Sequence, residues 1–329
     1  MSDRLNLLKK WLVELFKTSD FEIMPASEDA SFRSYYRVLI KDTSYIVMDA
    51  PPEHEDSALF VEISNKLRKS GVNVPFIFDK DIKQGFLLIT DFGNDLYLDK
   101  LNQSTVETLY SDAIRSLVRI QIDADVTGLG LYNETLLREE INLFFDWLLA
   151  RHLKINLDEK EFNDLNEITD LLIKNAMEQP QVFVHRDYHS RNLMLCDKDN
   201  PGIIDYQDAV LGPISYDLVS LLKDCYIKWK PGQINRWVNQ YLDELHTVNP
   251  AIKINNKQFQ KWFDLMGVQR HLKASGIFAR LCHRDGKCGF LNDIPRTLSY
   301  IVDLKHDYPE LDTLILVIEK CVLPKLEKN

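Results

Sequence analysis

The sequence predicts an α+β fold in which a small, mainly antiparallel β lobe precedes a large helical lobe. Strand-like segments are concentrated between residues 20 and 91, whereas helical periodicity dominates from residue 94 onward. Within the helical part, strands are expected only at 181–206. We therefore place the boundary after residue 92, so that residues 1–92 form the first lobe and 93–329 form the second.

Length and composition are those of an ordinary globular protein. The chain has 329 residues, of which 45% are hydrophobic and 27% are charged, which is enough for a substantial core. Forty Lys+Arg against fifty Asp+Glu give a net charge of −10, which argues against nucleic acid as a partner. Glycine is scarce, at 12 residues. The scarcity of glycine therefore argues against a glycine-rich phosphate-binding loop.

The N-terminal segment and the cysteines predict a cytoplasmic protein. Leu5, Leu8, Leu12 and Leu15 recur at helical spacing among charged residues, which predicts an amphipathic helix packed on the protein body and excludes a membrane span. The five cysteines form no C-x-x-C pair and are expected to be reduced thiols. A metal site built on Cys282, His283 and Cys288 is the disfavoured alternative, because the spacing matches no common zinc pattern.

The predicted elements of the first lobe are five strands and two helices. After the N-terminal helix, strands are expected at 21–26, 34–41, 44–50, 74–80 and 85–90. A helix is predicted from Asp56 to Lys69, between the Pro51-Pro52 break and Gly71, which suits the position after a helix end. In the second lobe, helices are expected at 104–123, 134–152, 159–178 and through most of 215–326.

The most informative stretch is a predicted β-hairpin within residues 181–209. An apolar strand leads into the polar loop HRDYHSRN (185–192), and the strand NLMLC, a turn and the strand IIDY follow. With the turn centred between Lys198 and Asp199, Asn192 lies opposite Asp205. Cross-strand Cβ atoms are about 4.5 to 5.5 Å apart. The pairing predicts an amide oxygen and a carboxylate beside Asp187, which suits Mg²⁺ and phosphate.

The loop 185–192 matches the H-x-D-x-x-x-x-N pattern of kinase catalytic loops. In that pattern the Asp accepts the proton of the substrate hydroxyl and the Asn holds a metal ion. We therefore predict Asp187 as the catalytic base, Asn192 and Asp205 as Mg²⁺ ligands, and ATP as the phosphoryl donor. His185 is expected to brace the loop.

The residues of this hairpin allow two other interpretations. Asn192 and Asp205 could simply cap turns, and HRDYH (185–189) could belong to a metal hydrolase with His and Asp ligands. The first leaves the spacing unexplained, and the second lacks further ligands at a sensible distance in the sequence.

The segment TDFG (90–93) resembles a kinase metal-binding motif but stands in the wrong place. It precedes Asp187, whereas the second metal carboxylate must follow the catalytic loop. Its position at the end of the strand GFLLIT, where the two lobes join, predicts instead a hinge whose backbone groups, at Thr90 and Asp91, meet the adenine of ATP.

These motifs resemble the aminoglycoside phosphotransferase and choline kinase superfamily. The resemblance runs from Ser27 to Leu222 and is carried by HRDYHSRN, IIDYQDA and GPISYDLVSLL. It implies a protein-kinase-like two-lobed fold and a small-molecule substrate, and it implies that Asp217 braces the catalytic loop. The residue types alone would also allow Asp217 to be a helix cap.

The predicted phosphate loop departs from that of kinases. The turn after the first strand contains no glycine, and Met48 stands where the β3 lysine is expected. Either the enzyme is an inactive, nucleotide-binding pseudokinase, or another cation neutralises the phosphates. We favour substitution by Arg33 or Arg37, because arginine binds phosphate oxygens in a bidentate manner. The predicted ATP-binding residues are Ser31, Phe32, Arg33, Arg37, Met48, Thr90 and Asp91.

Three further segments resemble one branch of the superfamily, the bacterial N-acetylmuramate/N-acetylglucosamine anomeric kinases of cell-wall sugar recycling. They are MDAPPE (48–53), EINLFFDWLLARHL (140–153) and MGVQRHLKASGIFARLCHRDGK (266–287). The resemblance implies transfer of the γ-phosphoryl group of ATP to an anomeric hydroxyl. A kinase acting on an aminoglycoside or choline is the alternative within the superfamily.

Several residues are predicted to contact the sugar. Residues 270–287 carry five Lys and Arg against one Asp, a net charge of +4 that would suit the lactyl carboxylate of N-acetylmuramate. The alternatives are a solvated helix face for the basic residues and core packing for the aromatic one. The predicted substrate-binding residues are His189, Trp147, Arg270, His271 and Arg284.

Overall fold

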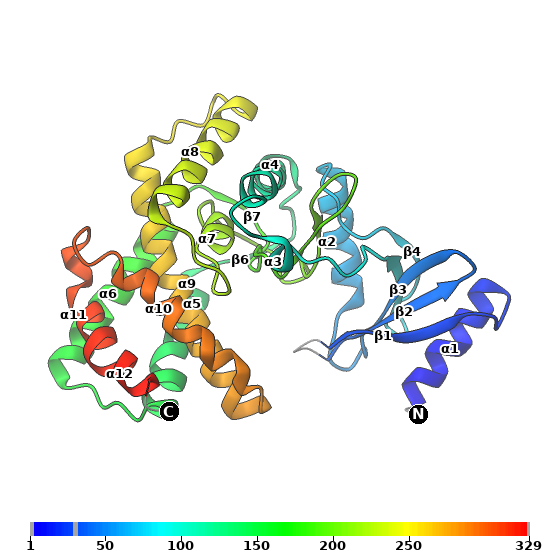
Figure 1. Cartoon of the computed structure of the whole chain (residues 1–329), viewed down its shortest axis with the longest axis horizontal. Coiled ribbons are helices and arrows are strands. Elements are labelled where there is room, and N and C mark those ends of the chain that lie inside the picture. Colours follow the sequence, from blue (N-terminus) through cyan, green and yellow to red (C-terminus); the bar gives the residue numbers. More distant parts are fainter. Residues whose placement is uncertain (1–2, 29–31, 328–329) are drawn as a thin grey trace. The chain divides into compact units, whose positions relative to one another are not determined.

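The computed structural model describes residues 3–28 and 32–327. Contacts between residues divide the chain into two compact units. The first unit comprises Met1–Asp95 and Met194–Gln207, and the second comprises Leu96–Leu193 and Asp208–Asn329. The division after Asp95 lies three residues beyond the expected boundary, and the first unit also includes most of the hairpin that the sequence placed in the second. Each unit is described by itself (Figure 1).

The first unit contains a five-stranded antiparallel sheet in the order β1-β2-β3-β5-β4. Its strands are β1 (Glu22–Glu28), β2 (Ser34–Ile40), β3 (Thr43–Asp49), β4 (Ile77–Asp81) and β5 (Phe86–Thr90). The predicted strands are thus confirmed, most of them to within one or two residues. At the centre of the sheet, Met48 of β3 pairs with Tyr35 and Leu87 and is fully buried.

Two helices flank this sheet in the sequence as predicted. Helix α1 (Asp3–Phe16) buries Leu8 and Leu12 in a cluster with Val38, Val47 and other sheet residues, which confirms its packing on the protein body. Helix α2 (Ser57–Lys69) begins at Asp56, whose carboxylate accepts hydrogen bonds from two backbone N–H groups of the first turn. It ends before Gly71, which adopts a φ of 81°.

The second unit is mostly helical. Its longer helices are α4 (Val106–Asp123), α5 (Glu134–Leu143), α6 (Glu159–Met177), α8 (Pro231–Val248) and α9 (Asn256–Asp285), and its shorter ones are α3 (Tyr97–Lys100), α7 (Tyr216–Leu222), α10 (Ile294–Val302), α11 (Asp312–Val317) and α12 (Leu323–Leu326). The expected helix at 134–152 continues from α5 as a π-helix, Phe144–His152. Three short turns of 3-10 or π-helix complete the unit: Cys288–Asp293, Pro309–Leu311 and Ile318–Val322.

Helix α9 is the central element of the second unit. Its 30 residues are buried along most of their length, and it contacts α5, α6, α7, α8 and α10. Gly276 lets it approach the end of α5 closely, because a Cβ atom there would lie 2.3 Å from the carbonyl carbon of Leu143. The helix ends at Gly286, which adopts a left-handed φ of 70°.

Strands β6 (Gly130–Leu131), β7 (Gln181–Val184) and β10 (Val210–Pro213) form a small sheet with β10 in the middle. The expectation that strands in this part of the chain are confined to 181–206 is therefore wrong for β6 and β10. These strands have two and four residues, too few to show a strand period. The predicted hairpin is present as β8 (Leu193–Met194) and β9 (Gly202–Ile203), with shorter strands than expected.

The cysteines are only partly as expected. Cys196, Cys225 and Cys321 are free thiols, but Cys282 and Cys288 form a disulfide at the end of α9, which corrects the prediction that all five are reduced. The chain turns back after Gly286 and brings the two Cα atoms within 4.1 Å. Across the described residues, no group of three or more His, Cys, Asp or Glu side chains is arranged to hold a metal ion. Nor does any helix in the described ranges have the length and apolar character needed to span a membrane.

Candidate active site

The catalytic loop, residues 185–192, follows β7 and is folded by its own hydrogen bonds. The backbone N–H of His189 donates to the carbonyl of Asp187 (3.0 Å), and the N–H of Asn192 donates to the carbonyl of His189 (2.9 Å). The Asn192 side-chain amide donates to the carbonyl of Asp187 (3.0 Å). The loop therefore holds the predicted base and the predicted metal ligand in one compact turn.

Asp217, in the first turn of α7, binds the start of this loop. Its carboxylate accepts hydrogen bonds from the backbone N–H groups of His185 (2.7 Å) and Arg186 (3.1 Å). Full burial raises its pKa to about 7, although the two N–H donors oppose the rise. Arg186 adopts a φ of 76°, a conformation that non-glycine residues rarely take. The bonds from Asp217 thus hold a strained backbone next to Asp187.

Asp187 is surrounded by cationic side chains of its own unit. Burial alone would raise the pKa of Asp187, but the positive charges of Lys273 and Arg270 oppose burial, and the pKa lies below its ordinary value. The carboxylate is therefore ionised at neutral pH, as a proton acceptor must be.

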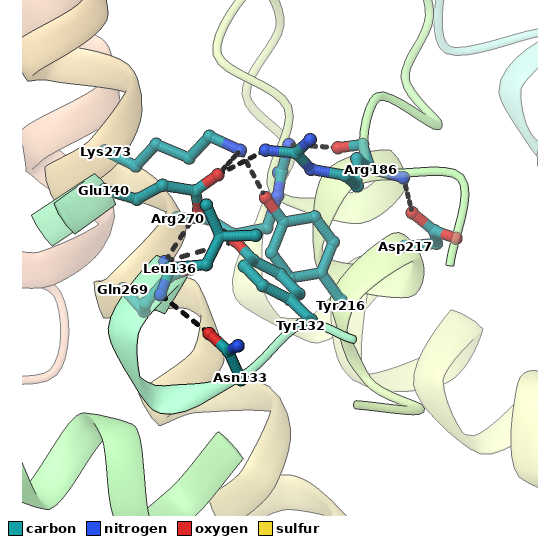
Figure 2. A network of polar contacts seen from close by, with 10 residues as sticks. All are labelled: Tyr132, Asn133, Leu136, Glu140, Arg186, Tyr216, Asp217, Gln269, Arg270 and Lys273. Carbon is teal, nitrogen blue, oxygen red and sulfur yellow. Dashed lines mark hydrogen bonds and ion pairs between the residues drawn. The ribbon is translucent and has the colours of Figure 1, made fainter. Parts of the chain in front are cut away.

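A buried polar network lies next to the catalytic loop and connects it to α5 and α9 (Figure 2). At its centre, the carboxylate of Glu140 forms ion pairs with Arg186 of the loop and with Lys273 (2.9 Å) of α9. The same carboxylate accepts hydrogen bonds from Tyr132 and Gln269. One acid thus neutralises two cations that come from distant parts of the sequence.

Helix α9 also contacts the loop directly through Arg270. Its guanidinium lies over the ring of Tyr216 (4.8 Å to the centroid) and donates to the carbonyl oxygen of Arg186 at 3.5 Å, the long limit for such a bond. Lys273 in turn donates to the Tyr216 hydroxyl (2.9 Å). These contacts hold in place the two cations that lower the pKa of the predicted base, Asp187.

Asp224, just after α7, holds the second half of the loop. It accepts hydrogen bonds from the backbone N–H (3.1 Å) and the hydroxyl of Ser190. Beside Ser190, His189 packs edge-to-face on Tyr226 (5.6 Å between centroids). Burial lowers the pKa of His189, despite the nearby carboxylates of Asp224 and Asp187, so the ring is neutral at pH 7.

The two predicted metal ligands belong to different units. Asn192 is in the second unit, and its amide nitrogen is engaged with Asp187, so its amide oxygen is the atom of ligand type. Asp205 is in the first unit, has a φ of 64° and accepts a hydrogen bond from the Gln207 side chain (2.9 Å). An amide oxygen and a carboxylate are both hard donors of the kind that Mg²⁺ binds.

Both arginines predicted to contact ATP hold carboxylates of the first unit. Arg33 pairs with Glu55 (2.5 Å), next to Phe32, which is exposed and stacked on His54. Arg37 forms a bidentate pair with Asp91 through its Nε (2.6 Å) and Nη2 (3.0 Å) atoms. The structure therefore ties predicted ATP-binding residues to each other or to neighbouring acids.

The three remaining predicted ATP-binding residues are Ser31, Thr90 and Met48, and the two that the structure describes differ in their surroundings. Ser31 lies outside the described residues. Thr90, at the end of β5, uses its hydroxyl to accept a hydrogen bond from the N–H of Phe76 (2.9 Å). Met48 is an apolar core residue, so the position that carries a lysine in kinases is filled here by packing.

The predicted substrate residues outside the loop have different surroundings. Trp147, in the π-helix, is partly exposed and has the guanidinium of Arg151 over its ring. His271 is buried, lies within 2.9 Å of the Lys223 carbonyl through Nε2 and stacks on Tyr300, which favours a packing role. Arg284 is exposed and forms a two-bond pair with its neighbour Asp285.

Sequence reasoning missed Glu140, Arg186 and Asp224. A signal for Glu140 was present, because it is an acid among the apolar positions Leu137, Ile141 and Phe144 of a predicted helix, and such an acid needs a buried partner. Nothing in the sequence identified the partners.

The chain is similar to known proteins over most of its length. Residues 22–251 match the sequence model of the phosphotransferase enzyme family. The chain is 45% identical to the N-acetylmuramate/N-acetylglucosamine kinase of Pseudomonas aeruginosa over 89% of its own length and 86% of that protein. It is 38% identical to the protein of the same name from Neisseria meningitidis, over 96% and 95% of the two chains.

Two solved structures show the fold. The choline kinase LicA from Streptococcus pneumoniae matches 92% of this chain and all of its own, with a TM-score of 0.64 and 13% identity. The ADP-bound aminoglycoside phosphotransferase APH(2'')-Ib matches 89% and 97% of the two chains, with a TM-score of 0.59 and 15% identity. The predicted protein-kinase-like fold, with a small antiparallel β lobe and a helical remainder, is confirmed.

Proposed function

The chain belongs to the phosphotransferase enzyme family, and from that membership we propose that it is an ATP-dependent kinase for N-acetylmuramate and N-acetylglucosamine. The anomeric hydroxyl is the acceptor, and the product is a sugar 1-phosphate. The observation that carries the proposal is the ionised Asp187, held by the network around Asp217 and Glu140 in a loop of kinase type. The names of the relatives support the choice of sugar.

In this proposal, Asp187 orients the anomeric hydroxyl and accepts its proton as the bond to phosphorus forms. Positioning and neutralisation of charge supply most of the remaining acceleration in phosphoryl transfer. The neutral ring of His189, two residues further along the loop, donates or accepts a hydrogen bond at a neighbouring sugar hydroxyl. Its Nδ1 atom is buried and has no hydrogen-bond partner among the described residues.

Asn192 and Asp205 would hold Mg²⁺, as their amide and carboxylate oxygens suit that ion. Bound Mg²⁺ neutralises the charge of the ATP phosphates. On the side of the first unit, Thr90 and Asp91 are proposed to meet adenine, and Arg33 or Arg37 to replace the absent lysine. Either arginine would have to exchange its present carboxylate partner for phosphate. We place the enzyme in the cytoplasm, where ATP is available.

The test is ADP release with N-acetylmuramate, N-acetylglucosamine, kanamycin or choline as the acceptor. We expect turnover with the amino sugars and a loss of about 100-fold or more in kcat for Asp187→Asn. Asp243→Asn, an exposed acid on α8, is the matched control and should leave kcat unchanged. Turnover with kanamycin or choline alone would show that the protein is an aminoglycoside kinase or a choline kinase instead. ATP binding without turnover of any acceptor would instead indicate a pseudokinase.

A further inference from the structure

Beside the catalytic loop, three aromatic rings of the second unit lie in contact in a row. Tyr226 follows α7, Phe278 lies on α9, and Phe290 lies in the short helix Cys288–Asp293. The Tyr226 and Phe278 centroids are 6.3 Å apart, and Phe278 and Phe290 stack at 5.6 Å with an interplanar angle of 15°. We call Tyr226, Phe278 and Phe290 the ring platform.

Arg191 of the catalytic loop rests on this platform. Its guanidinium carbon lies 4.7 Å from the centroid of Tyr226 and 5.5 Å from that of Phe290. Stacking on aromatic faces fixes the plane of a guanidinium and leaves N–H donors at its edge, where a planar anion can bind in a bidentate manner. The side chain is thus oriented before any ligand arrives.

Arg191 is an exposed cation of the loop that has no carboxylate partner among the described residues; Arg270 forms no ion pair either, but it is buried against the ring of Tyr216. Arg186 and Lys273 share Glu140, and Arg284 pairs with Asp285. Among the described residues, no carboxylate lies within ion-pair distance of Arg191, although the residue is exposed and the protein carries a net charge of −10. An oriented arginine without an anion, beside the base of a kinase, is suited to an anionic part of the acceptor.

One acid fixes the loop and the ring platform to each other. One carboxylate oxygen of Asp224 accepts from the N–H of Ser190 (3.1 Å), and the other accepts from the N–H of Tyr226 (3.0 Å). Ser190 immediately precedes Arg191, and Asp187 is four residues from it in the same folded loop. The distance between Arg191 and the base is therefore set by this common anchor.

We infer that Arg191 is a specificity-determining residue that binds the carboxylate of N-acetylmuramate. The inference rests on the proposed function. The two proposed substrates share a pyranose ring and an acetamido group, but only N-acetylmuramate bears a lactyl carboxylate, on O3. Arg191 therefore distinguishes the two sugars, whereas the buried residues Arg270 and Lys273 contact the loop through Arg186 and Glu140.

The experiment compares kcat/KM for the two sugars in the wild type and in Arg191→Met, which keeps an apolar stem on the platform. A charge-assisted pair of this kind corresponds to about a 10- to 100-fold loss for N-acetylmuramate. For N-acetylglucosamine we expect a change of less than about threefold, the size of a weak electrostatic effect. Arg191→Lys, which keeps the charge but not the planar fork, should fall between. Arg236→Met, an exposed arginine on α8, is the matched control.

The outcomes separate the inference from the proposed function. Wild-type inactivity with both sugars refutes the proposed function and the inference with it. Wild-type turnover of both sugars, with an equal loss or no loss in Arg191→Met, refutes the inference alone. Wild-type turnover of N-acetylglucosamine but not N-acetylmuramate also refutes it.

Discussion

Replacing Glu140 with glutamine tests whether the buried network of the second unit is held together by that one charge. The side chain of Glu140 is only 7% exposed, and its two cationic partners, Lys273 and Arg186, are 11% and 21% exposed. Glutamine keeps the shape but leaves Lys273 and Arg186 without the carboxylate that pairs with them. Removing one partner of a buried ion pair costs about 3 to 5 kcal/mol. Because Arg186 is partly exposed to solvent, we expect the free energy of unfolding to fall by about 3 kcal/mol, the lower figure.

The assay is urea unfolding followed by far-UV circular dichroism, with Lys273→Met and the double variant completing a cycle. Removing Lys273 together with the charge of Glu140 takes away one of the stranded cations, so the double variant should lose less stability than the sum of the single variants, by about 1 kcal/mol or more. Glu134→Gln is the matched control on the same helix. Glu134 is exposed, and its pair with Arg138 should contribute less than about 0.5 kcal/mol.

A loss below about 1 kcal/mol in Glu140→Gln, comparable to an exposed pair, would refute this reasoning. Strict additivity of the two single variants would do the same, because it would mean that Glu140 and Lys273 do not interact energetically in the folded protein.

Two more predictions concern α9. Burial lowers the pKa of His271 to about 3, so between pH 6.5 and 3 the unfolded chain takes up a proton that the native state does not. The wild type should therefore lose about 2 kcal/mol from this group between pH 7.5 and pH 5, and His271→Gln should lack that part of the pH dependence in urea unfolding; an equal pH dependence would contradict this. Gly276→Ala should destabilise by about 2 kcal/mol or more, because its Cβ would overlap the Leu143 backbone. Gly232→Ala, in open space on α8, should be neutral in the same melts, and equal melting temperatures for the two variants would count against overlap.

The folding of the catalytic loop was predictable from the sequence, because Asp187 and Asn192 lie within one eight-residue segment and are joined by a hydrogen bond of that segment. The predicted pairing of Asn192 with Asp205 across the hairpin stays a prediction. Helix α2 was equally predictable, because Asp56 and Gly71 mark its ends with side-chain and backbone chemistry.

The parts that depend on distant contacts were not predictable. The ion pairs of Glu140 join residues 46 and 133 positions away, and no local pattern identifies such partners. Strand β10 consists of VLGP and exists because β6 and β7 pair with its two edges. The sequence shows how many basic residues lie at 270–287, but not which of them are buried and which are exposed. The structure uses Arg270 and Lys273 inside the protein and leaves Arg284 outside with Asp285.

Helix α9 has a consequence for how such an enzyme can change its substrate. Thirty residues give a rod about 45 Å long, on which Lys273, the support of the catalytic base, and Phe278, part of the ring platform, are separated by little more than one turn. Because both residues lie on one continuous helix, their spacing stays constant whatever the adjoining loops do. Exchanges in the last two turns and in the segment that follows can therefore alter which acceptor is chosen, while the apparatus for proton removal stays the same. Selection could act on the two properties separately within a single helix.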